Sequence, residues 1–246
     1  MNQFNCIKIL GINFFNGTVE QVMNFLKSGG LLVVPAAPAL ITIKSDAPYY
    51  QSLLSADVVI PDSGYMSLVW NLFHKKKIKR ISGLEFLTAF FEDTDVKTAG
   101  IVLINPDEKE AETNLSFLRQ KEFDQLYITS YTAPLYEKKR VEDKKLLEII
   151  EDKKPKYILI NLGGGVQEKL GAYLKKNISY KAAIMCTGAA IAFLTGHQAK
   201  IPRWGDKFFM GWLFRCFENP KLYVPRYFKA FSLFTLLLHY GKNAPP

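Results

Sequence analysis

An aspartate and an arginine in the first third of the chain are the first side chains whose types and spacing suggest chemistry. Asp62 ends the apolar run DVVIPD, and Arg80 closes the basic run KKKIKR 18 residues later. A carboxylate at the end of a buried strand is well placed to act as a general base, and an arginine can bind a diphosphate through paired hydrogen bonds. The structural alternatives are that Asp62 caps a helix beginning near Ser63 and that the basic run is a solvated connector.

A glycine-rich turn forms the second group. Gly163, Gly164 and Gly165 follow an apolar run and precede Gln167 and Glu168. Glycines that lead into a helix N-terminus can bind a phosphate, and the two polar residues can hydrogen-bond sugar hydroxyls or an amide. The turn is not a dinucleotide-binding fingerprint, because Glu168 stands where the third glycine would be, and it lacks the Gly-Lys-Ser/Thr of a P-loop. The alternatives are a purely structural turn and a Glu168 that only complements the helix dipole.

The elements that must position these residues alternate along the chain. Apolar runs predict strands at residues 6–15 (a strand or hairpin), 31–35, 57–62, 100–106, 125–129 and 157–165, and a strand, turn and helix over 181–196. Helices are predicted at residues 18–26, 47–55, 64–73, 83–91, 107–121, 137–152 and 166–176. This alternation indicates an α/β fold, a parallel sheet with helices on both faces.

Ligands bind such sheets beyond the carboxyl ends of the strands. The residues that follow the apolar runs are therefore the candidates for a site: 35–37, 61–64, 105–106, 163–168 and 187–188. Asp93-Thr94-Asp95 matches the D-x-D pattern of many metal and nucleotide-diphosphate sites, but it falls between a helix end and a strand start, at the opposite edge. The three cysteines and three histidines show no metal-ligand spacing and no CxxC pair. We therefore expect no metal and no cofactor, and a reducing compartment.

The positive charge is concentrated at the C-terminal end. Of the net +9, residues 200–246 carry +6, with eight Lys or Arg against two acidic residues, and they hold 12 of the 33 aromatic residues. We therefore divide the chain into a core, residues 1–197, and an appendage, residues 198–246. A basic, aromatic segment suits an anionic membrane surface or a nucleic acid. The third alternative is that its apolar residues pack on the core or on a second copy of the chain, as a homo-oligomer.

A membrane surface is the preferred interpretation of the appendage. Its apolar stretch, Ala230 to Leu238, has nine residues, far fewer than the roughly 20 of a spanning helix. It is better suited to lie in the interface with its cations at the lipid phosphates. The N-terminus has no signal-peptide pattern, so the expected location is cytoplasmic, peripheral at the inner face of the cytoplasmic membrane.

Five segments in order resemble one family, the WecG/TagA/CpsF glycosyltransferases of bacteria, which build surface polysaccharides and wall teichoic acids. The resemblance covers about residues 15–230. The segments are SADVVIPDSGYMSLVW, RISGLE, ILINLGGGVQEKLGAYL, TGAAIAFLTGHQAKIPRW and FMGWLFRCFENPKLYVPRYF.

The resemblance implies a Rossmann-like core with a C-terminal appendage that supports membrane association and supplies arginines. It implies a metal-independent, inverting transfer of a hexose, often N-acetylmannosamine, from a UDP-sugar to N-acetylglucosamine linked through diphosphate to a polyprenyl lipid. It implies no nucleic-acid partner. By position, Asp62 resembles the catalytic base, Arg80 a substrate-binding cation and Gln167 a sugar or nucleotide contact. Arg215 resembles an appendage arginine directed at the diphosphate, and Arg226 is a looser match.

The chain also departs from the family's pattern. Pro35-Ala36-Ala37 stands in place of T-x-N, Ile191-Ala192 in place of Phe-Asp, and Gly211 in place of the Glu of a Glu-Trp pair. These departures indicate a different donor sugar, or a non-catalytic protein of the same fold that binds a nucleotide sugar or a lipid diphosphate. Retained chemistry is favoured because the following residues are kept: Asp62, Arg80, Gln167, Glu168 and Arg215.

Overall fold

A computed structural model describes residues 5–137, 140–196, 205 and 211–246. The predicted boundary between core and appendage, at residues 197 and 198, lies outside these described residues, as do Lys200, Arg203 and Lys207 of the basic segment.

The centre of the molecule is one eight-stranded sheet in the order β1-β2-β4-β3-β8-β7-β5-β6. Among the described strands, β1 and β2 alone are antiparallel, and they form the hairpin expected at residues 6–15; the other neighbours in the sheet are parallel. The central strands are buried on both faces, as their continuous apolar runs predict. The strands are β1 (Cys6–Ile9), β2 (Ile12–Phe15), β3 (Gly30–Val33), β4 (Val58–Val59), β5 (Ile101–Asn105), β6 (Ile128–Thr132), β7 (Tyr157–Ile160) and β8 (Ala183–Cys186).

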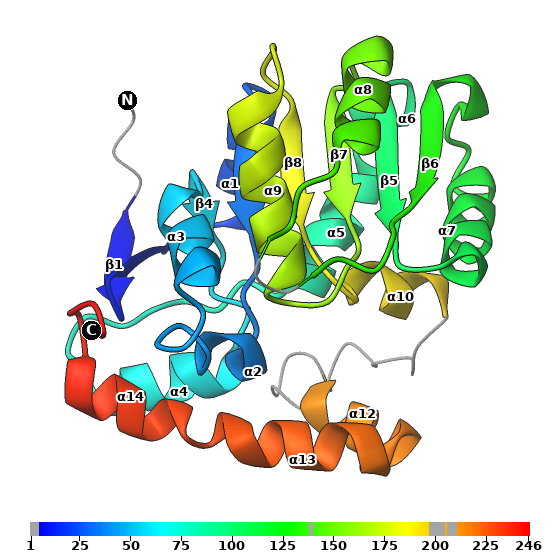
Figure 1. The fold of residues 1–246 in the computed structure, drawn as a ribbon. Coiled ribbons are helices and arrows are strands. Elements are labelled where there is room, and N and C mark those ends of the chain that lie inside the picture. Colours follow the sequence, from blue (N-terminus) through cyan, green and yellow to red (C-terminus); the bar gives the residue numbers. More distant parts are fainter. Residues whose placement is uncertain (1–4, 138–139, 197–204, 206–210) are drawn as a thin grey trace.

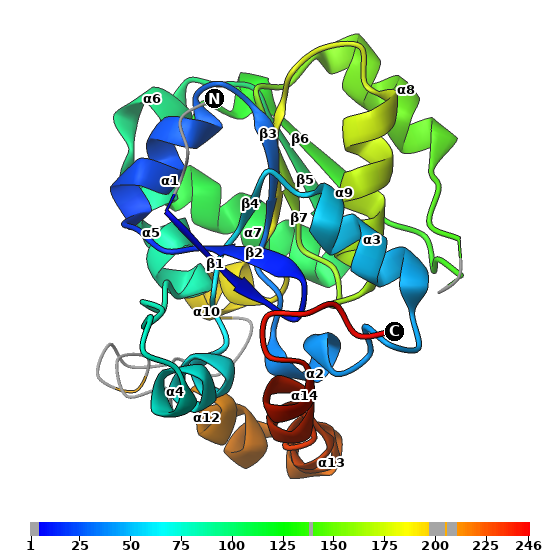
Figure 2. The same ribbon diagram turned by 90° about the vertical axis from the view of Figure 1, so that its left-hand side faces the viewer.

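Helices cover both faces of this sheet (Figures 1 and 2), which confirms the predicted α/β class. One face carries α3 (Ala47–Ser55), α8 (Lys144–Lys153) and α9 (Val166–Asn177). The other carries α1 (Val19–Leu26), α5 (Gly83–Glu92), α6 (Thr94–Lys97), α7 (Glu108–Gln120) and α10 (Ala190–Thr195). Each layer buries its apolar side against the sheet, which gives the domain two hydrophobic clusters.

Two predicted elements begin later than the sequence pattern suggests. The helix expected from residue 137 begins at Lys144, because the side chain of Asp143 accepts a hydrogen bond from the Leu146 amide at 2.9 Å and so caps the helix. The other carboxylate oxygen of Asp143 accepts from the hydroxyls of Tyr131 and Tyr136. The strand expected from residue 125 begins at Ile128, after a short 3₁₀ turn.

The appendage lies along the end of the molecule that carries the carboxyl ends of the parallel strands (Figure 1). It consists of α12 (Gly211–Glu218), α13 (Pro220–Ala230) and α14 (Leu233–Tyr240), and it packs on α2 (Ala37–Leu40) and α4 (Gly64–Phe73). Leu233 and Leu237 are buried within the main core. Beyond α14, the carbonyl of Gly241 accepts from the Leu10 amide at 2.8 Å, which attaches the end of the chain to the first hairpin.

Of the helices within the described ranges, none is long and apolar enough to cross a membrane.

Candidate active site

Asp62 lies just beyond β4 and is held by the N-terminus of α5. Its Oδ1 accepts a hydrogen bond from the Gly83 amide at 2.9 Å, and Nη2 of Arg80 lies 3.6 Å from the same oxygen. Arg80 also donates through Nε to the backbone carbonyl of Asp62 at 2.7 Å. The sequence pair separated by 18 positions is therefore a contact pair, and each residue positions the other.

This environment holds the Asp62 side chain while leaving it accessible. The α5 N-terminus and the Arg80 guanidinium both contact Oδ1. The side chain is 29% exposed, and within the described part of the chain its Oδ2 makes no hydrogen bond. An ionised carboxylate with one open oxygen can accept a proton from a bound hydroxyl group.

Asp62 lines a cavity of about 610 Å³ at the carboxyl edge of the sheet. Its walls come from residues that follow β3, β4, β7 and β8, from α2 and from the appendage helices α12 and α13. Eight of the nine predicted site residues line it: Asp62, Arg80, Gly163, Gly164, Gln167, Glu168, Arg215 and Arg226. A volume of this size is typical of a small-molecule site.

Gly165 is the predicted residue that does not line the cavity. It has φ of +91° and caps α9, where its amide donates to Oε2 of Glu168 at 2.6 Å. That amide is thus occupied by a carboxylate of the protein. Among the described residues, the amides of Gly163 and Gly164 make no hydrogen bond, so these two are the donors that the turn offers to a ligand.

Glu168 is fully buried beside the cavity. Besides the Gly165 amide it accepts from Nε2 of Gln167 at 3.1 Å. Burial raises its pKa to about 7 against the effect of these hydrogen bonds and of Lys169. Its charge in turn contributes to the raised pKa values of Tyr49 and Cys186, for which burial is the larger cause. Glu168 therefore holds the turn and orients Gln167, a positioning role that the helix-dipole alternative only partly describes.

Replacing Glu168 with glutamine is expected to remove a pH dependence of stability. Because the folded-state pKa of about 7 lies above the ordinary value of 4.5, the folded protein binds more protons than the unfolded chain between these pH values. The free energy of unfolding should therefore fall by about 3 kcal/mol as the pH rises through this window. Urea unfolding at pH 5 and pH 8 measures the difference, which Glu168→Gln should largely abolish. The exposed Glu112→Gln control should keep it, and an unchanged difference in Glu168→Gln would contradict the assignment.

Arg215 and Arg226 bring positive charge to the cavity from the appendage. The guanidinium of Arg215 lies 4.6 Å from the ring centroid of Phe193 in α10 and 5.9 Å from that of Tyr223 in α13. It also donates to the hydroxyl of Tyr227 at 3.2 Å. Within the described residues, neither arginine forms an ion pair with a carboxylate. With Arg80, they are the three arginines that line the cavity among the described residues, and such a set suits an anionic ligand.

Several cavity residues were not predicted individually. Tyr223, Tyr227 and Phe193 line the cavity as supports of Arg215, but a lone aromatic residue carries no sequence signal. Asn161 also lines it; it was included in the strand predicted over 157–165, and its polarity inside the apolar run YILINL was the available signal.

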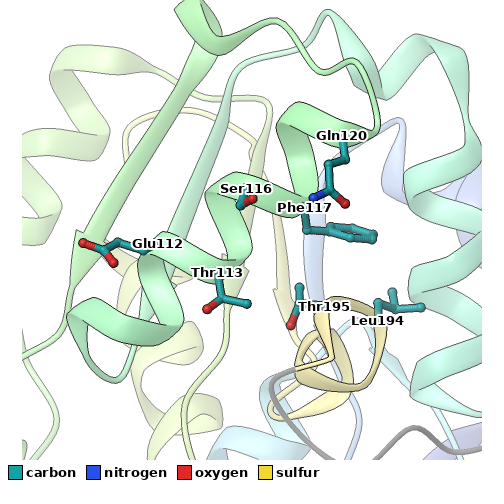
Figure 3. Close-up of a pocket in the computed structure, with 7 residues that line it drawn as sticks. All are labelled: Glu112, Thr113, Ser116, Phe117, Gln120, Leu194 and Thr195. Carbon is teal, nitrogen blue, oxygen red and sulfur yellow. The ribbon is translucent and has the colours of Figure 1, made fainter.

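A second hollow of about 330 Å³ lies between α7 and α10 (Figure 3). Its walls are Glu112, Thr113, Ser116, Phe117, Gln120, Leu194 and Thr195. None of these is a cation, so the hollow does not suit a diphosphate.

Asp93 and Asp95 have structural contacts at the start of α6. Asp93 accepts from the Asp95 amide at 2.9 Å as the helix cap, and Asp95 faces Lys27 at 3.9 Å. In the described ranges, no three His, Cys, Asp or Glu residues are grouped so that they could hold a metal ion.

Comparisons with known proteins relate the chain to one family. The sequence model of the Glycosyl transferase WecG/TagA/CpsF family matches residues 7–244. An N-acetylglucosaminyldiphosphoundecaprenol N-acetyl-beta-D-mannosaminyltransferase of Bacillus spizizenii (strain ATCC 23059 / NRRL B-14472 / W23) is 22% identical over 224 residues, which are 88% of this chain and 82% of the relative.

Proposed function

The chain belongs to the WecG/TagA/CpsF family and is a glycosyltransferase, and we propose that it moves a hexose of the N-acetylmannosamine class from UDP to a sugar linked through diphosphate to a polyprenyl lipid. The reaction inverts the anomeric carbon and needs no metal ion. The product serves the synthesis of a bacterial surface polysaccharide or teichoic acid. The Bacillus relative is named for a transfer of this kind.

One observation carries the proposal: among the residues that the structure describes, a supported carboxylate and three arginines from two parts of the chain line the same cavity. Asp62 and Arg80 come from the core, and Arg215 and Arg226 come from the appendage. A transfer from a nucleotide diphosphate requires a base for the incoming hydroxyl and positive charge for the departing diphosphate.

The proposed chemistry is a single displacement. Oδ2 of Asp62 takes the proton of the acceptor hydroxyl. At the same time the oxygen of that hydroxyl attacks the anomeric carbon from the side opposite UDP. The bond to the diphosphate breaks, and its electron pair leaves with UDP. Arg80, Arg215 and Arg226, with the open amides of Gly163 and Gly164, stabilise the developing charge. A bidentate arginine suits this task because its planar fork matches phosphate geometry.

An exposed apolar patch adjoins the mouth of the cavity and supports a membrane-bound acceptor. Its members are exposed apolar residues of α4 and of the appendage. They are Leu68, Leu72 and Phe73 in α4, Phe228 in α13, Phe231 between α13 and α14, and Phe234 and Leu238 in α14. Ring contacts between Tyr65 and Phe231 and between Phe73 and Phe234 join α4 to the appendage. Leu68 and Phe231 also line the cavity. Large contiguous exposed apolar patches mark interaction sites.

We place this patch against the inner leaflet of the cytoplasmic membrane, with the lipid diphosphate entering the cavity beside it. Exposed lysines follow α4 directly, at Lys75 to Lys77, and Lys229 lies within α13. Each cation near an anionic surface contributes about 1 kcal/mol of binding energy.

The patch includes part of the core, because α4 contributes three of its residues. The appendage is also partly buried, since Ala230, Leu233 and Leu237 pack in the core, so point substitutions test the patch better than deletion of the appendage.

The double variant Leu72→Ser/Phe228→Ser is expected to bind anionic liposomes at least about tenfold more weakly, because each removed side chain contributes roughly 1.5–3 kcal/mol when fully buried. These side chains are 74% and 76% exposed and do not line the cavity. Sedimentation with phosphatidylglycerol liposomes measures the effect. The control Leu126→Ser/Leu135→Ser removes two exposed leucines outside the patch and should bind like the wild type. Equal loss in both variants would refute a specific patch.

The function itself is tested by product analysis. Purified protein is incubated with a panel of UDP-hexoses, including UDP-N-acetylmannosamine, and a soluble N-acetylglucosamine diphosphate acceptor, with and without EDTA. Mass spectrometry should detect a disaccharide diphosphate in both conditions. Loss of product with EDTA would contradict metal independence. Binding of UDP-hexoses with no product from any donor would favour the non-catalytic binding protein.

A further inference from the structure

A buried amide network fixes the direction of the Asn161 side chain. Nδ2 of Asn161 donates to Oδ1 of Asn105 at 3.2 Å, and Asn114 donates to the same oxygen at 2.8 Å. Asn105 in turn donates to the hydroxyl of Ser130 at 3.1 Å. Because this network uses the amide nitrogen of Asn161, its carbonyl oxygen is the atom left over. That oxygen is buried and makes no hydrogen bond within the described residues.

Gln167 and Thr187 present two more atoms of the same kind. The nitrogen of the Gln167 amide donates to Glu168, so its Oε1 is left over, buried and without a partner among the described residues. The hydroxyl of Thr187 is also buried and unpartnered there. Asn161, Gln167 and Thr187 are 4%, 3% and 5% exposed, respectively, and all three residues line the cavity. Unpaired buried polar atoms are rare because each costs about 1–3 kcal/mol, so three around one cavity point to a ligand.

The sheet register brings these atoms together. Ile160 of β7 pairs with Cys186 of β8, so Asn161 and Thr187 are the next residues on two neighbouring parallel strands. Adjacent strands lie about 4.8 Å apart, which is within the width of one sugar ring. The amide of Gln167 lies beside Gly188, the residue that follows Thr187: a Cβ added to Gly188 would be 3.3 Å from Nε2 of Gln167. Gly188 therefore leaves the space that this amide occupies.

The chemistry of the three atoms selects the ligand group. Two are carbonyl oxygens, which only accept hydrogen bonds, and the hydroxyl accepts as well. A fully ionised phosphate has no hydrogen to donate, whereas a sugar ring presents several hydroxyl groups. The neighbouring strand end contributes Ala36, Ala37 and Ala39 to the cavity wall, and their side chains offer no hydrogen bond. Hydroxyl recognition on this side of the cavity thus depends on the ends of β7 and β8.

We infer that Asn161 and Thr187 join Gln167, already expected as a sugar or nucleotide contact, in a subsite that binds hydroxyl groups of a sugar ring in the nucleotide-sugar donor. The inference rests on the proposed function and deepens it. The ring is either the ribose of UDP or the transferred hexose. Both rings present hydroxyl groups, and binding of UDP compared with UDP-N-acetylmannosamine distinguishes them. The arginines bind the diphosphate, and this subsite positions the sugar.

The test measures affinity and stability in the variants Thr187→Val and Asn161→Leu. Each removes an acceptor at nearly constant volume. Isothermal titration calorimetry with UDP and with UDP-N-acetylmannosamine should show binding about 3- to 30-fold weaker per variant. Weaker binding of both ligands identifies the ribose, and weaker binding of the sugar nucleotide alone identifies the hexose. Thr187→Ser, which keeps the hydroxyl, should retain most of the affinity.

Thermal unfolding separates this role from a structural one. Thr187→Val removes an unpaired buried hydroxyl, so the melting temperature of the free protein should stay the same or rise. A lower melting temperature with unchanged affinity would show a structural role and overturn the inference, as would unchanged affinity of both variants for both ligands. Failure of the wild type to bind either ligand is a distinct result, which would overturn the proposed donor and the inference with it.

Discussion

Asp62→Asn is expected to lower turnover by about 10²–10⁴-fold, the usual contribution of a general base. Asparagine keeps the oxygen that accepts from the Gly83 amide, a bond of 2.9 Å in the native protein, but it cannot take up a proton. Affinity for UDP and the melting temperature should change little. The rate of sugar transfer to a soluble diphosphate-linked acceptor is the measurement, made under saturating donor.

Asp95→Asn is the matched control for this prediction. Asp95 is an exposed aspartate of the D-x-D segment, remote from the cavity, and its side chain is 71% exposed. Its substitution should leave turnover unchanged. Wild-type turnover in Asp62→Asn would exclude Asp62 as the base. A large loss of turnover in Asp95→Asn would indicate that the D-x-D segment takes part in the reaction.

Arg215→Ala is expected to lower turnover by about 10²–10³-fold, the typical cost of removing one preorganised group that stabilises charge in the transition state. UDP should bind more weakly as well. Arg215→Lys should recover only part of the loss, because a lysine cannot reproduce the contacts of the guanidinium with the rings of Phe193 and Tyr223. Steady-state rates over a range of donor concentrations separate turnover from binding.

Arg119→Ala is the control, since Arg119 is an exposed arginine of α7 outside the cavity. It removes the same charge from the protein and should leave turnover and UDP binding unchanged. Equal effects of Arg119→Ala and Arg215→Ala would show that overall charge, and not the placement of Arg215, supports the reaction.

Local features of the chain were predictable from the sequence because their causes lie within a few residues. The buried runs of β5, β7 and β8 are apolar throughout, which indicates parallel strands covered on both faces. Asp62 and the glycine turn each follow such a run, so their place at the carboxyl edge follows from the alternation of strands and helices. The basic, aromatic composition of residues 200–246 indicated a separate task for that segment.

Contacts between distant segments were decided by the tertiary structure alone. The order of the strands places Asn161 beside Thr187, and no local pattern contains the register of β7 on β8. Arg215 of α12 reaches the cavity because α12 packs on α13 and α13 packs on α2. The later start of α8 depends on Tyr131 and Tyr136, which bind the capping Asp143 from outside the helix. The burial that raises the pKa of Glu168 comes from surrounding elements. In each case the stabilising contacts join residues that are far apart in sequence. Residue types and spacing could therefore suggest the site, while packing determines which of its atoms are in contact.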